Sequence, residues 1–322
     1  MSGAVLLTGG TGFLGRAVLH RLFAIDKRPL IVAARMLTPS FSSNVKVEHV
    51  NEIGAETDWT ACLHGVEVVI HCAARTHVMS DEIADPLAEY RKVNVQGTLA
   101  LARQAAKYGV RRFVFISSIK VNGERSLPNR PFRPDDPPVP EDAYGVSKYE
   151  AEQGIMTLAQ ETGMEVVIIR PPLVYGPGVK GNFATMLGWV RKGVPLPLGQ
   201  VENQRSLVAL ENLADFVALC SDCARSPLAA NEIFLISDVE DVSTTELLHK
   251  LALAYGVSSR LIPIPVTWIQ AAARVLGKGA VVDRLFGSLV VDSSKARELL
   301  GWTPVISMDK QLQKMALHDS RI

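Results

Sequence analysis

The stretch Leu6-Leu-Thr-Gly-Gly-Thr-Gly-Phe-Leu-Gly15 places three glycines between an apolar run and a segment of helical periodicity. The run from Ala4 to Leu7 predicts a short buried strand. The apolar positions after the glycines recur at helical spacing, namely Phe13, Leu14, Ala17, Val18, Leu22 and Phe23. A strand, a glycine turn and a helix in this order are the context in which such a GxxGxxG pattern indicates dinucleotide binding.

Glycine suits that chemistry because the turn is tight, the backbone must approach a pyrophosphate closely, and the helix must pack against the strand. The helix N-terminus then offers N–H groups and a positive dipole end to the anion. A loop that merely needs flexibility is the alternative, but further strand–helix units follow this one. We therefore predict a cofactor site at this turn, formed by Gly9, Gly12, Phe13, Leu14 and Gly15.

The composition excludes several classes of protein. The 322 residues are 48% hydrophobic, which is enough for a sizeable core, and 34 basic against 33 acidic residues give a net charge of +1. This balance argues against a nucleic-acid partner. Four cysteines without framework spacing favour a reducing cytoplasm. We expect no signal peptide and, since no apolar run approaches ~18 residues, no membrane span.

Strands and helices alternate along the first part of the chain, which predicts an α/β fold with a doubly wound parallel sheet. Strands are expected at 29–34, 45–50, 66–70, 112–117 and 165–170, and long helices at 86–108 and 144–162. Residues 1–175 are predicted to form a Rossmann domain, to which a strand near 231–237 returns. Residues 176–322 are predicted to form mainly a smaller substrate-binding region. The proline-rich loop 127–142 is either a solvated linker or, as we favour, an ordered flap over the site.

Tyr144 and Lys148 form a Tyr-x-x-x-Lys pair that shares one helix face. A nearby ammonium and an oxidised nicotinamide would favour the phenolate and lower the pKa of the tyrosine. The phenol could then exchange a proton with an alcohol oxygen while hydride moves at the adjacent carbon. Ser117 and Ser118, at the end of an earlier strand, supply a hydroxyl for the same oxygen.

Several motifs together resemble the extended short-chain dehydrogenase/reductases, in particular the NAD-dependent epimerase/dehydratase family. They occur in this order: Thr8-Gly-Gly-Thr-Gly-Phe-Leu-Gly15, Ala73-Ala74, Asn94-Val-Gln-Gly-Thr98, Phe115-Ile-Ser-Ser118, Tyr144-Gly-Val-Ser-Lys148, Arg170-Pro-Pro-Leu-Val-Tyr-Gly-Pro177 and Asp292-Ser-Ser-Lys-Ala-Arg-Glu-Leu-Leu-Gly-Trp302. The resemblance covers nearly the whole chain. It implies a catalytic set of Ser118, Tyr144 and Lys148, and an Asn94 that steadies the active-site strand and helix.

The resemblance also implies residues that hold the cofactor and the substrate. Ala73 and Ala74 would line the cofactor together with Asn94, Tyr144 and Lys148, and Glu52-Ile53 aligns with the pair at the adenine. Family members use nucleotide-diphosphate sugars, whose phosphates are met by arginines. Arg205 and Arg284 are the matching positions, and each could instead be a solvated surface arginine. Lys120 and Asn182 complete the expected substrate contacts.

Arg35 bears on the choice of cofactor, because NAD-preferring enzymes place an acid at the end of the second strand, on the ribose 2′-hydroxyl. An arginine there can meet a 2′-phosphate, although it could also be a plain surface residue. We therefore predict NADP(H), with NAD(H) as the alternative. No metal is expected, since Cys220 and Cys223 lack a second ligand pair and His71 ends a buried strand.

Departures from the family pattern reduce the number of family activities expected for this chain. The dehydratases of the family carry Asp-Glu where this chain has Ile119-Lys120, so dehydration is not expected. Lys120-Val-Asn-Gly123 resembles a subgroup grouped with UDP-glucose 4-epimerases, which includes 4-keto reductases for bacterial surface polysaccharide. Leu289 stands where relatives with tyrosine exclude an N-acetyl group.

Our main expectation is reduction of a UDP-4-keto-6-deoxy-N-acetylhexosamine. The alternative is 4-epimerisation of a UDP-hexose or UDP-N-acetylhexosamine, and a non-catalytic dinucleotide-binding protein is a remote one. A cytoplasmic homodimer is expected from the resemblance.

Overall fold

A parallel sheet of seven strands forms the centre of the fold in the computed structural model, which describes residues 3–35, 45–76, 85–275 and 286–320. Its spatial order is β3-β2-β1-β4-β5-β6-β9, and every pairing is parallel. The strands are β1 (Ala4–Thr8), β2 (Leu30–Ala34), β3 (Val45–His49), β4 (Val66–His71), β5 (Arg112–Ile116), β6 (Glu165–Arg170) and β9 (Glu232–Leu235). This order confirms the doubly wound Rossmann sheet expected from the sequence.

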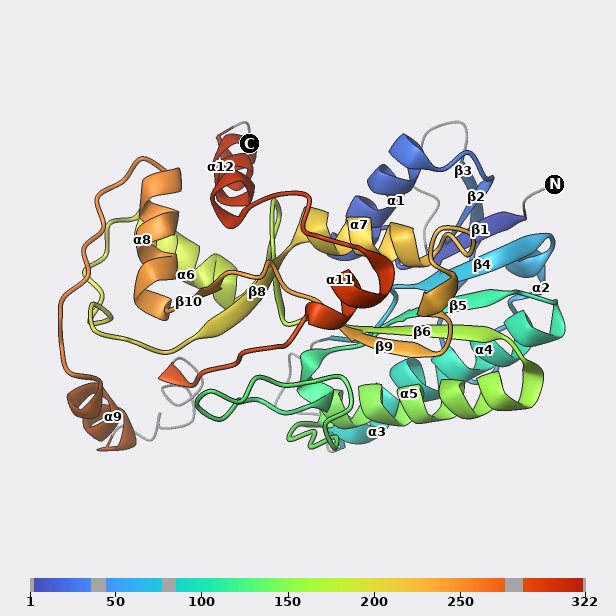
Figure 1. Cartoon of the computed structure of the whole chain (residues 1–322), viewed down its shortest axis with the longest axis horizontal. Helices are drawn as coiled ribbons and strands as arrows, with labels where there is room; N and C mark the ends of the chain where they lie inside the picture. The colour runs from blue at the N-terminus through green and yellow to red at the C-terminus, as the bar shows by residue number, and fades with distance from the viewer. Residues whose placement is uncertain (1–2, 36–44, 77–84, 276–285, 321–322) are drawn as a thin grey trace.

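Both faces of this sheet are covered by helices, and alternate side chains of each strand enter opposite cores (Figure 1). In β1, Val5 and Leu7 face a core shared with α1 (Phe13–Ile25) and α7 (Leu210–Cys220), whereas Leu6 faces the core of α4 (Thr98–Lys107) and α5 (Ala143–Thr162). All five residues of β1 are buried. The continuous apolar run that predicted this strand is therefore the pattern of a strand buried on both faces.

The helix expected at 86–108 is divided in the structure. It begins as α3 (Pro86–Tyr90), widens into the π-helical segment η1 (Arg91–Gly97), and continues as α4. The π segment brings Gly97 against Ile53, where an added Cβ would lie 2.5 Å from Ile53 Cγ2. Single π turns inside α-helices often occur at functional sites, and this one carries Asn94.

A second, three-stranded sheet lies beyond the carboxyl end of β6. Its order is β10-β8-β7, made by β7 (Leu173–Tyr175), β8 (Arg205–Ala209) and β10 (Asp241–Val242). Around it pack α6 (Gly181–Arg191), α8 (Thr244–Ala254) and α12 (Met308–Asp319), which share a separate core (Figure 1). The remaining elements are the short α2 (Thr60–Leu63), η2 (Ile119–Val121), η3 (Pro227–Ala229), α9 (Val266–Val275) and α11 (Ser294–Leu300).

The proline-rich loop is held in place by hydrogen bonds to two other segments. Phe132 N–H donates to the Val290 carbonyl at 2.8 Å, and Asp292 N–H donates to the Phe132 carbonyl at 2.8 Å. Val139 N–H donates to the carbonyl of Val121 at 3.0 Å. The loop is therefore an ordered strap between η2 and the segment before α11, and the alternative of a solvated linker was wrong.

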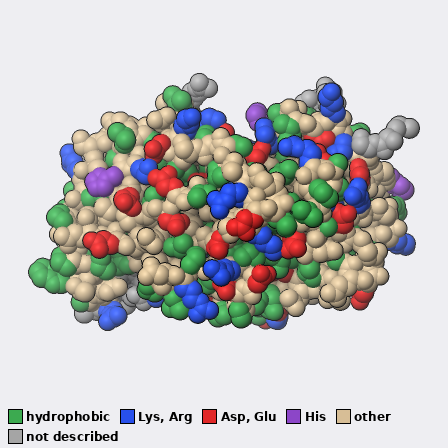
Figure 2. Space-filling model, in the orientation of Figure 1, with side chains coloured by type: hydrophobic (Ala, Val, Ile, Leu, Met, Phe, Trp, Pro, Cys, Tyr) green, Lys and Arg blue, Asp and Glu red, His purple; other side chains and the backbone are tan. Residues whose placement is uncertain are grey.

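Positive and negative side chains intermingle on the face of the molecule shown in Figure 2. That face carries no continuous field of one sign, in keeping with the near-zero net charge. Within the described ranges, no helix has both the length and the apolar character that a membrane crossing requires.

Arg170, at the end of β6, forms a buried ion pair with Glu152 of α5. Two hydrogen bonds join them, Nε to Oε1 at 3.0 Å and Nη2 to Oε2 at 2.6 Å. Glu152→Ala leaves the guanidinium buried without its carboxylate, so we expect a loss of about 3–5 kcal/mol in the free energy of unfolding by urea. Lys314→Ala, which removes an exposed pair with Glu211, should cost no more than about 1 kcal/mol. Equal losses in the two variants would contradict this account.

Candidate active site

The glycine turn between β1 and α1 leaves no room for larger residues. Gly9 has a left-handed φ of 71°, and Gly12 N–H donates to its carbonyl at 2.9 Å. A Cβ on Gly15 would lie 2.1 Å from that same carbonyl oxygen. Helix α1 begins at Phe13 with no side-chain cap at Gly12, so its first N–H groups have no capping side chain. The turn therefore fits the pyrophosphate of a dinucleotide.

The residues after β4 contact the same turn. A Cβ on Gly9 would lie 2.7 Å from Ala73 N, and Ala73 N–H donates to Thr8 Oγ1 at 3.3 Å. Ala73 and Ala74 are half-buried beside it. β1 and β4 end on either side of the topological switch point, which is where open α/β sheets bind ligands. The residues that follow these strand ends include Gly9, Ala73 and Ala74, which have small side chains or none.

His71 lies beneath this turn as a neutral, buried side chain. Its Nδ1 lies 2.7 Å from Thr8 Oγ1 and its Nε2 lies 3.0 Å from Thr98 Oγ1. The ring stacks on Phe115 with centroids 5.9 Å apart. Burial lowers the pKa of His71 to about 3, with a smaller contribution from the Lys148 charge. These contacts agree with the structural role expected for this histidine.

Asn94 connects three segments of the site. Its Oδ1 accepts from Arg75 N–H at 2.8 Å, and its Nδ2 donates to the Arg75 carbonyl and to Ser147 Oγ, both at 3.0 Å. The side chain is 1% exposed. It therefore ties the π segment to the loop after β4 and to the first turns of α5.

Ser118 lies just after β5, whereas Tyr144 and Lys148 both lie on α5. Ser118 caps η2, accepting from Lys120 N–H at 3.2 Å, while Ser117 before it is buried. Tyr144 lies in the first turn of α5 and is half-buried, with its ring edge-on to Tyr90 at 5.8 Å. Lys148, one turn later, is 1% exposed, and its Nζ lies 4.2 Å from the centroid of the Phe115 ring.

The protonation of this pair differs in part from the sequence-based expectation. Burial lowers the pKa of Lys148 to about 8, against a smaller opposing effect of Glu152. Burial also raises the pKa of Tyr144 well above its ordinary value, and the charges of Asp142 and Tyr90 raise it further. For the protein alone this direction is opposite to the lowering expected from the lysine together with an oxidised nicotinamide, and Lys148 is not among the causes that act on the phenol. The lowering with a bound cofactor stays a prediction.

Lys120 is paired with protein carboxylates. Its ammonium contacts Asp142 Oδ2 and lies 3.4 Å from Glu124 Oε1. Asp142 is also the N-cap of α5, where its Oδ1 accepts from Gly145 N–H at 2.7 Å. Asp142 was not predicted as a site residue, although an aspartate just before a helical stretch is an ordinary N-cap signal.

At the expected adenine end, the predicted residues have different surroundings. Arg35 is exposed directly after β2, and its carbonyl accepts from His49 Nε2 at 3.0 Å. The Glu52 carboxylate lies 2.9 Å from Lys92 Nζ in an exposed ion pair. Ile53 packs against Gly97.

The expected substrate residues Arg205 and Asn182 belong to the part of the chain that forms the small sheet and its helices. Arg205 begins β8, and its Nη1 donates to the Gly287 carbonyl at 3.0 Å. Burial lowers the pKa of this arginine. Leu289 pairs with Arg205 across an isolated bridge and is 8% exposed. Asn182 is exposed in the first turn of α6, and Arg284 lies outside the described residues.

A buried network behind the site was not predicted. Arg170 Nη1 donates to Asn122 Oδ1 at 3.0 Å, and Asn122 Nδ2 donates to the Arg133 carbonyl at 2.9 Å. Together with the Glu152 pair, these bonds connect β6, α5, η2 and the proline-rich strap. Arg170 begins the motif that runs to Pro177, but the spacing of that motif did not indicate which side chains the arginine contacts.

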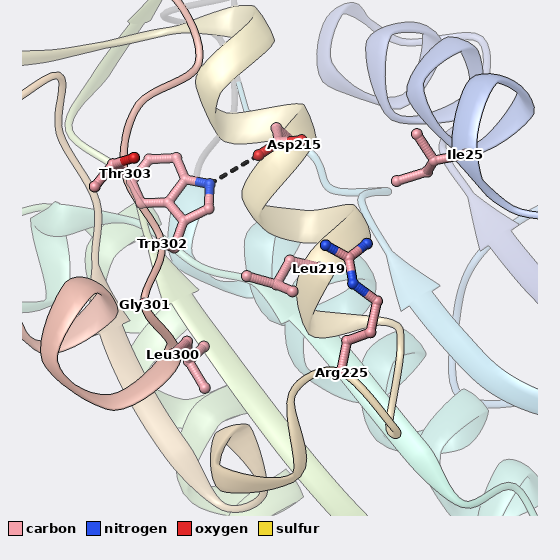
Figure 3. Close-up of a pocket in the computed structure, with 8 residues that line it drawn as sticks. All are labelled: Ile25, Asp215, Leu219, Arg225, Leu300, Gly301, Trp302 and Thr303. Atoms are coloured by element: carbon pink, nitrogen blue, oxygen red, sulfur yellow. Dashed lines mark hydrogen bonds between the residues drawn. The ribbon is translucent and has the colours of Figure 1, made fainter.

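A pocket of about 230 Å³ lies elsewhere, between the ends of α1, α7 and α11 (Figure 3). Asp215 in its wall accepts from Trp302 Nε1 at 2.8 Å and pairs with Arg21 at 2.6 Å. Cys220 and Cys223 are buried thiols nearby in the chain. In the part of the chain that the structure describes, no group of three or more His, Cys, Asp or Glu side chains is arranged to hold a metal ion.

Comparisons with known proteins show the family of this chain. A family model described as "NAD dependent epimerase/dehydratase family" matches residues 5–233. A UDP-glucose 4-epimerase of Vibrio cholerae is 45% identical over 317 residues, covering 98% of this chain and 95% of the relative.

Two solved structures share the fold. A UDP-glucose 4-epimerase of Thermotoga maritima with UDP-glucose has a TM-score of 0.77 at 24% identity, covering 99% of both chains. A UDP-glucuronic acid 4-epimerase of Bacillus cereus in complex with NAD has a TM-score of 0.79 at 19% identity, also covering 99% of both chains.

The buried, neutral His71 predicts a pH dependence of stability. An unfolded histidine binds its proton near pH ~6.5, whereas folded His71 does so only near a pKa of about 3. Stability is therefore lost as pH falls from about 6.5 toward 3, by about 1.4 kcal/mol per pH unit from this group alone. We expect His71→Gln to reduce the slope of unfolding free energy against pH in this window. His249→Gln, at an exposed position, should leave the slope as it is, and an unchanged slope in His71→Gln would count against a neutral His71.

Proposed function

The chain belongs to the NAD-dependent epimerase/dehydratase family, and from that premise we propose that it interconverts the C4 epimers of a UDP-hexose or UDP-N-acetylhexosamine. The observation that carries the proposal is the 45% identity, over 98% of the chain, with a UDP-glucose 4-epimerase. It favours the epimerase over the 4-keto reductase expected from the sequence. We propose that Ser118, Tyr144 and Lys148 supply the chemistry.

In the proposed reaction Tyr144 acts as the acid/base at the sugar O4. Its phenolate oxygen removes the O4 proton while the C4–H bond breaks, and it returns a proton to O4 when that bond reforms on the opposite face. The nicotinamide dinucleotide, when bound, supplies the hydride acceptor and donor at C4. Because hydride and proton are both returned, the net reaction consumes no oxidant. The Ser118 hydroxyl would hold O4 in place.

Lys148 would supply the cation that this proton transfer needs. The resting phenol of Tyr144 is held protonated by burial, so a phenolate requires positive charge close to it. Lys148 lies one turn along the same helix and is mostly protonated at neutral pH, since its pKa is about 8. The ammonium is buried with its Nζ 4.2 Å from the centroid of the Phe115 ring, which limits how far it can move.

Arg205 would hold the nucleotide diphosphate of the substrate. It begins β8, and its Nη1 donates to the Gly287 carbonyl at 3.0 Å. Leu289 beside it is a smaller side chain than the tyrosine that excludes N-acetyl groups in relatives, which favours an N-acetylated sugar. UDP-N-acetylglucosamine and UDP-glucose are therefore the two substrates to compare.

The first experiment incubates the protein as purified with each UDP-sugar, without added reductant, and measures the C4 epimer by NMR. We expect interconversion, and Tyr144→Phe should reduce kcat by at least ~10²-fold, the usual size of a general acid/base contribution. Tyr149→Phe, one residue past Lys148, is the matched control and should retain turnover. Stoichiometric NADPH consumption with a UDP-4-keto-6-deoxy-N-acetylhexosamine, with no epimerisation, would instead establish the reductase.

We further propose that the resident cofactor is NAD(H) rather than the NADP(H) expected from Arg35. The family description names NAD, and one structural neighbour was solved with NAD. We expect the wild-type protein to bind NADH more tightly than NADPH.

Arg35→Asp tests the role of that position. It should weaken NADPH binding by roughly 10-fold or more, because a charge-assisted contact to the 2′-phosphate is lost, and should change NADH binding little. Dissociation constants measured by fluorescence titration decide this. Tighter binding of NADPH by the wild-type protein would restore the NADP(H) assignment.

A further inference from the structure

The contact between Lys120 and Asp142 lies directly against the helix turn that carries Tyr144. Lys120 belongs to η2, whose backbone packs on the start of α5: a Cβ on Gly145 would lie 2.8 Å from the Lys120 carbonyl oxygen. Lys120 and Asp142 side chains are 37% and 29% exposed, and Glu124 next to them is 13% exposed. The cluster is thus partly shielded from water, so its charges act on their neighbours more strongly than surface charges do.

Asp142 has two separate partners, one for each carboxylate oxygen. Oδ1 accepts from Gly145 N–H and caps α5, while Oδ2 contacts the Lys120 ammonium. Asp142 lies two residues before Tyr144 in the chain. Its negative charge is one of the causes that raise the pKa of the Tyr144 phenol. An uncompensated Asp142 would disfavour the phenolate even more.

We propose that Lys120 and Asp142 are positioning residues for Tyr144: the ammonium offsets the Asp142 carboxylate and thereby sets how readily the phenol gives up its proton. The inference rests on the acid/base role proposed for Tyr144 and deepens it. It also differs from the direct substrate contact expected for Lys120, because here the lysine acts through Asp142.

Other charges near α5 are mostly committed to partners of their own. On α3 and η1 these are Tyr90, the Arg75–Glu89 and Arg91–Glu150 pairs and the Lys92–Glu52 pair. On the other packed elements they are Glu124 after η2, Arg103 and Lys107 of α4, the Arg170–Glu152 pair and Glu165 with its arginines at β6, and Lys148 on α5 itself. The neutral His71 below adds no charge near neutral pH. Lys120 is therefore the cation whose removal leaves Asp142 without its ion-pair partner.

The test uses two substitutions that must act in opposite directions. Lys120→Met leaves Asp142 uncompensated, which should move the pH of half-maximal kcat upward by roughly half to one pH unit. Asp142→Asn keeps an N-cap acceptor for Gly145 but removes the negative charge, so the same midpoint should move downward by a similar amount. The double variant should return near the wild-type midpoint. A purely structural role predicts no such opposition of sign.

A second readout does not depend on turnover. Tetranitromethane nitrates phenolate, so the nitration rate of Tyr144 at fixed pH, measured by mass spectrometry relative to Tyr108, reports its ionised fraction. We expect Tyr144 to be nitrated fastest in Asp142→Asn, more slowly in the wild type and most slowly in Lys120→Met, with steps of roughly 3- to 10-fold in rate. Lys314→Met, which removes a distant exposed ion pair, is the matched control and should equal the wild type.

The two readouts separate the possible failures. If the wild-type protein turns over no UDP-sugar, the proposed function fails, while the nitration order still tests the charge pair. If Lys120→Met raises KM and leaves both the pH midpoint and the nitration rate unmoved, the positioning role is overturned in favour of substrate contact. Shifts of the same sign in Lys120→Met and Asp142→Asn would overturn it as well.

Discussion

Close backbone contact at the first turn is the constraint on which the rest of the site depends. At Gly9 and Gly15 only a hydrogen atom fits, because a Cβ would meet Ala73 N at 2.7 Å in one case and the Gly9 carbonyl oxygen at 2.1 Å in the other. This contact sets α1 against β1 and brings the end of β4 to the same point.

Buried polar side chains then join the elements around the site by hydrogen bonds. Asn94 fixes the loop after β4 to α5, and Arg170 fixes the same helix to β6 and, through Asn122, to the proline-rich strap. Because such groups are costly when left unpaired, each network favours a single arrangement of the elements it joins. Tyr144 and Lys148 lie on the helix held by both networks, so their positions are determined by contacts far beyond their own turn.

The sequence predicted what local patterns can encode. Apolar runs located the strands of the large sheet, and the i to i+4 spacing put Tyr144 and Lys148 on one face. It did not predict the π segment, which lies against Ile53 at Gly97, a contact between residues far apart in the chain. Nor did it predict the Lys120–Asp142 pair, since periodicity says nothing about which side chains meet across η2 and α5. The raised pKa of Tyr144 was not predicted for a similar reason, because desolvation depends on how the folded chain packs around the phenol.

The position of β9 in the large sheet has a consequence for synthesis of the protein on the ribosome. β9 pairs with β6, yet the small sheet's β7 and β8, together with α7, lie between them in the chain. Helix α7 also covers α1, with Asp215 bonded to Arg21 across 194 positions. Until residue 220 has emerged, one face of β1 lacks the cover of α7, and until residue 235 has emerged, one side of β6 is an unpaired strand edge. The nascent chain must therefore hold its glycine turn and first strands in an unfinished layer, open to edge-to-edge association, for most of its translation.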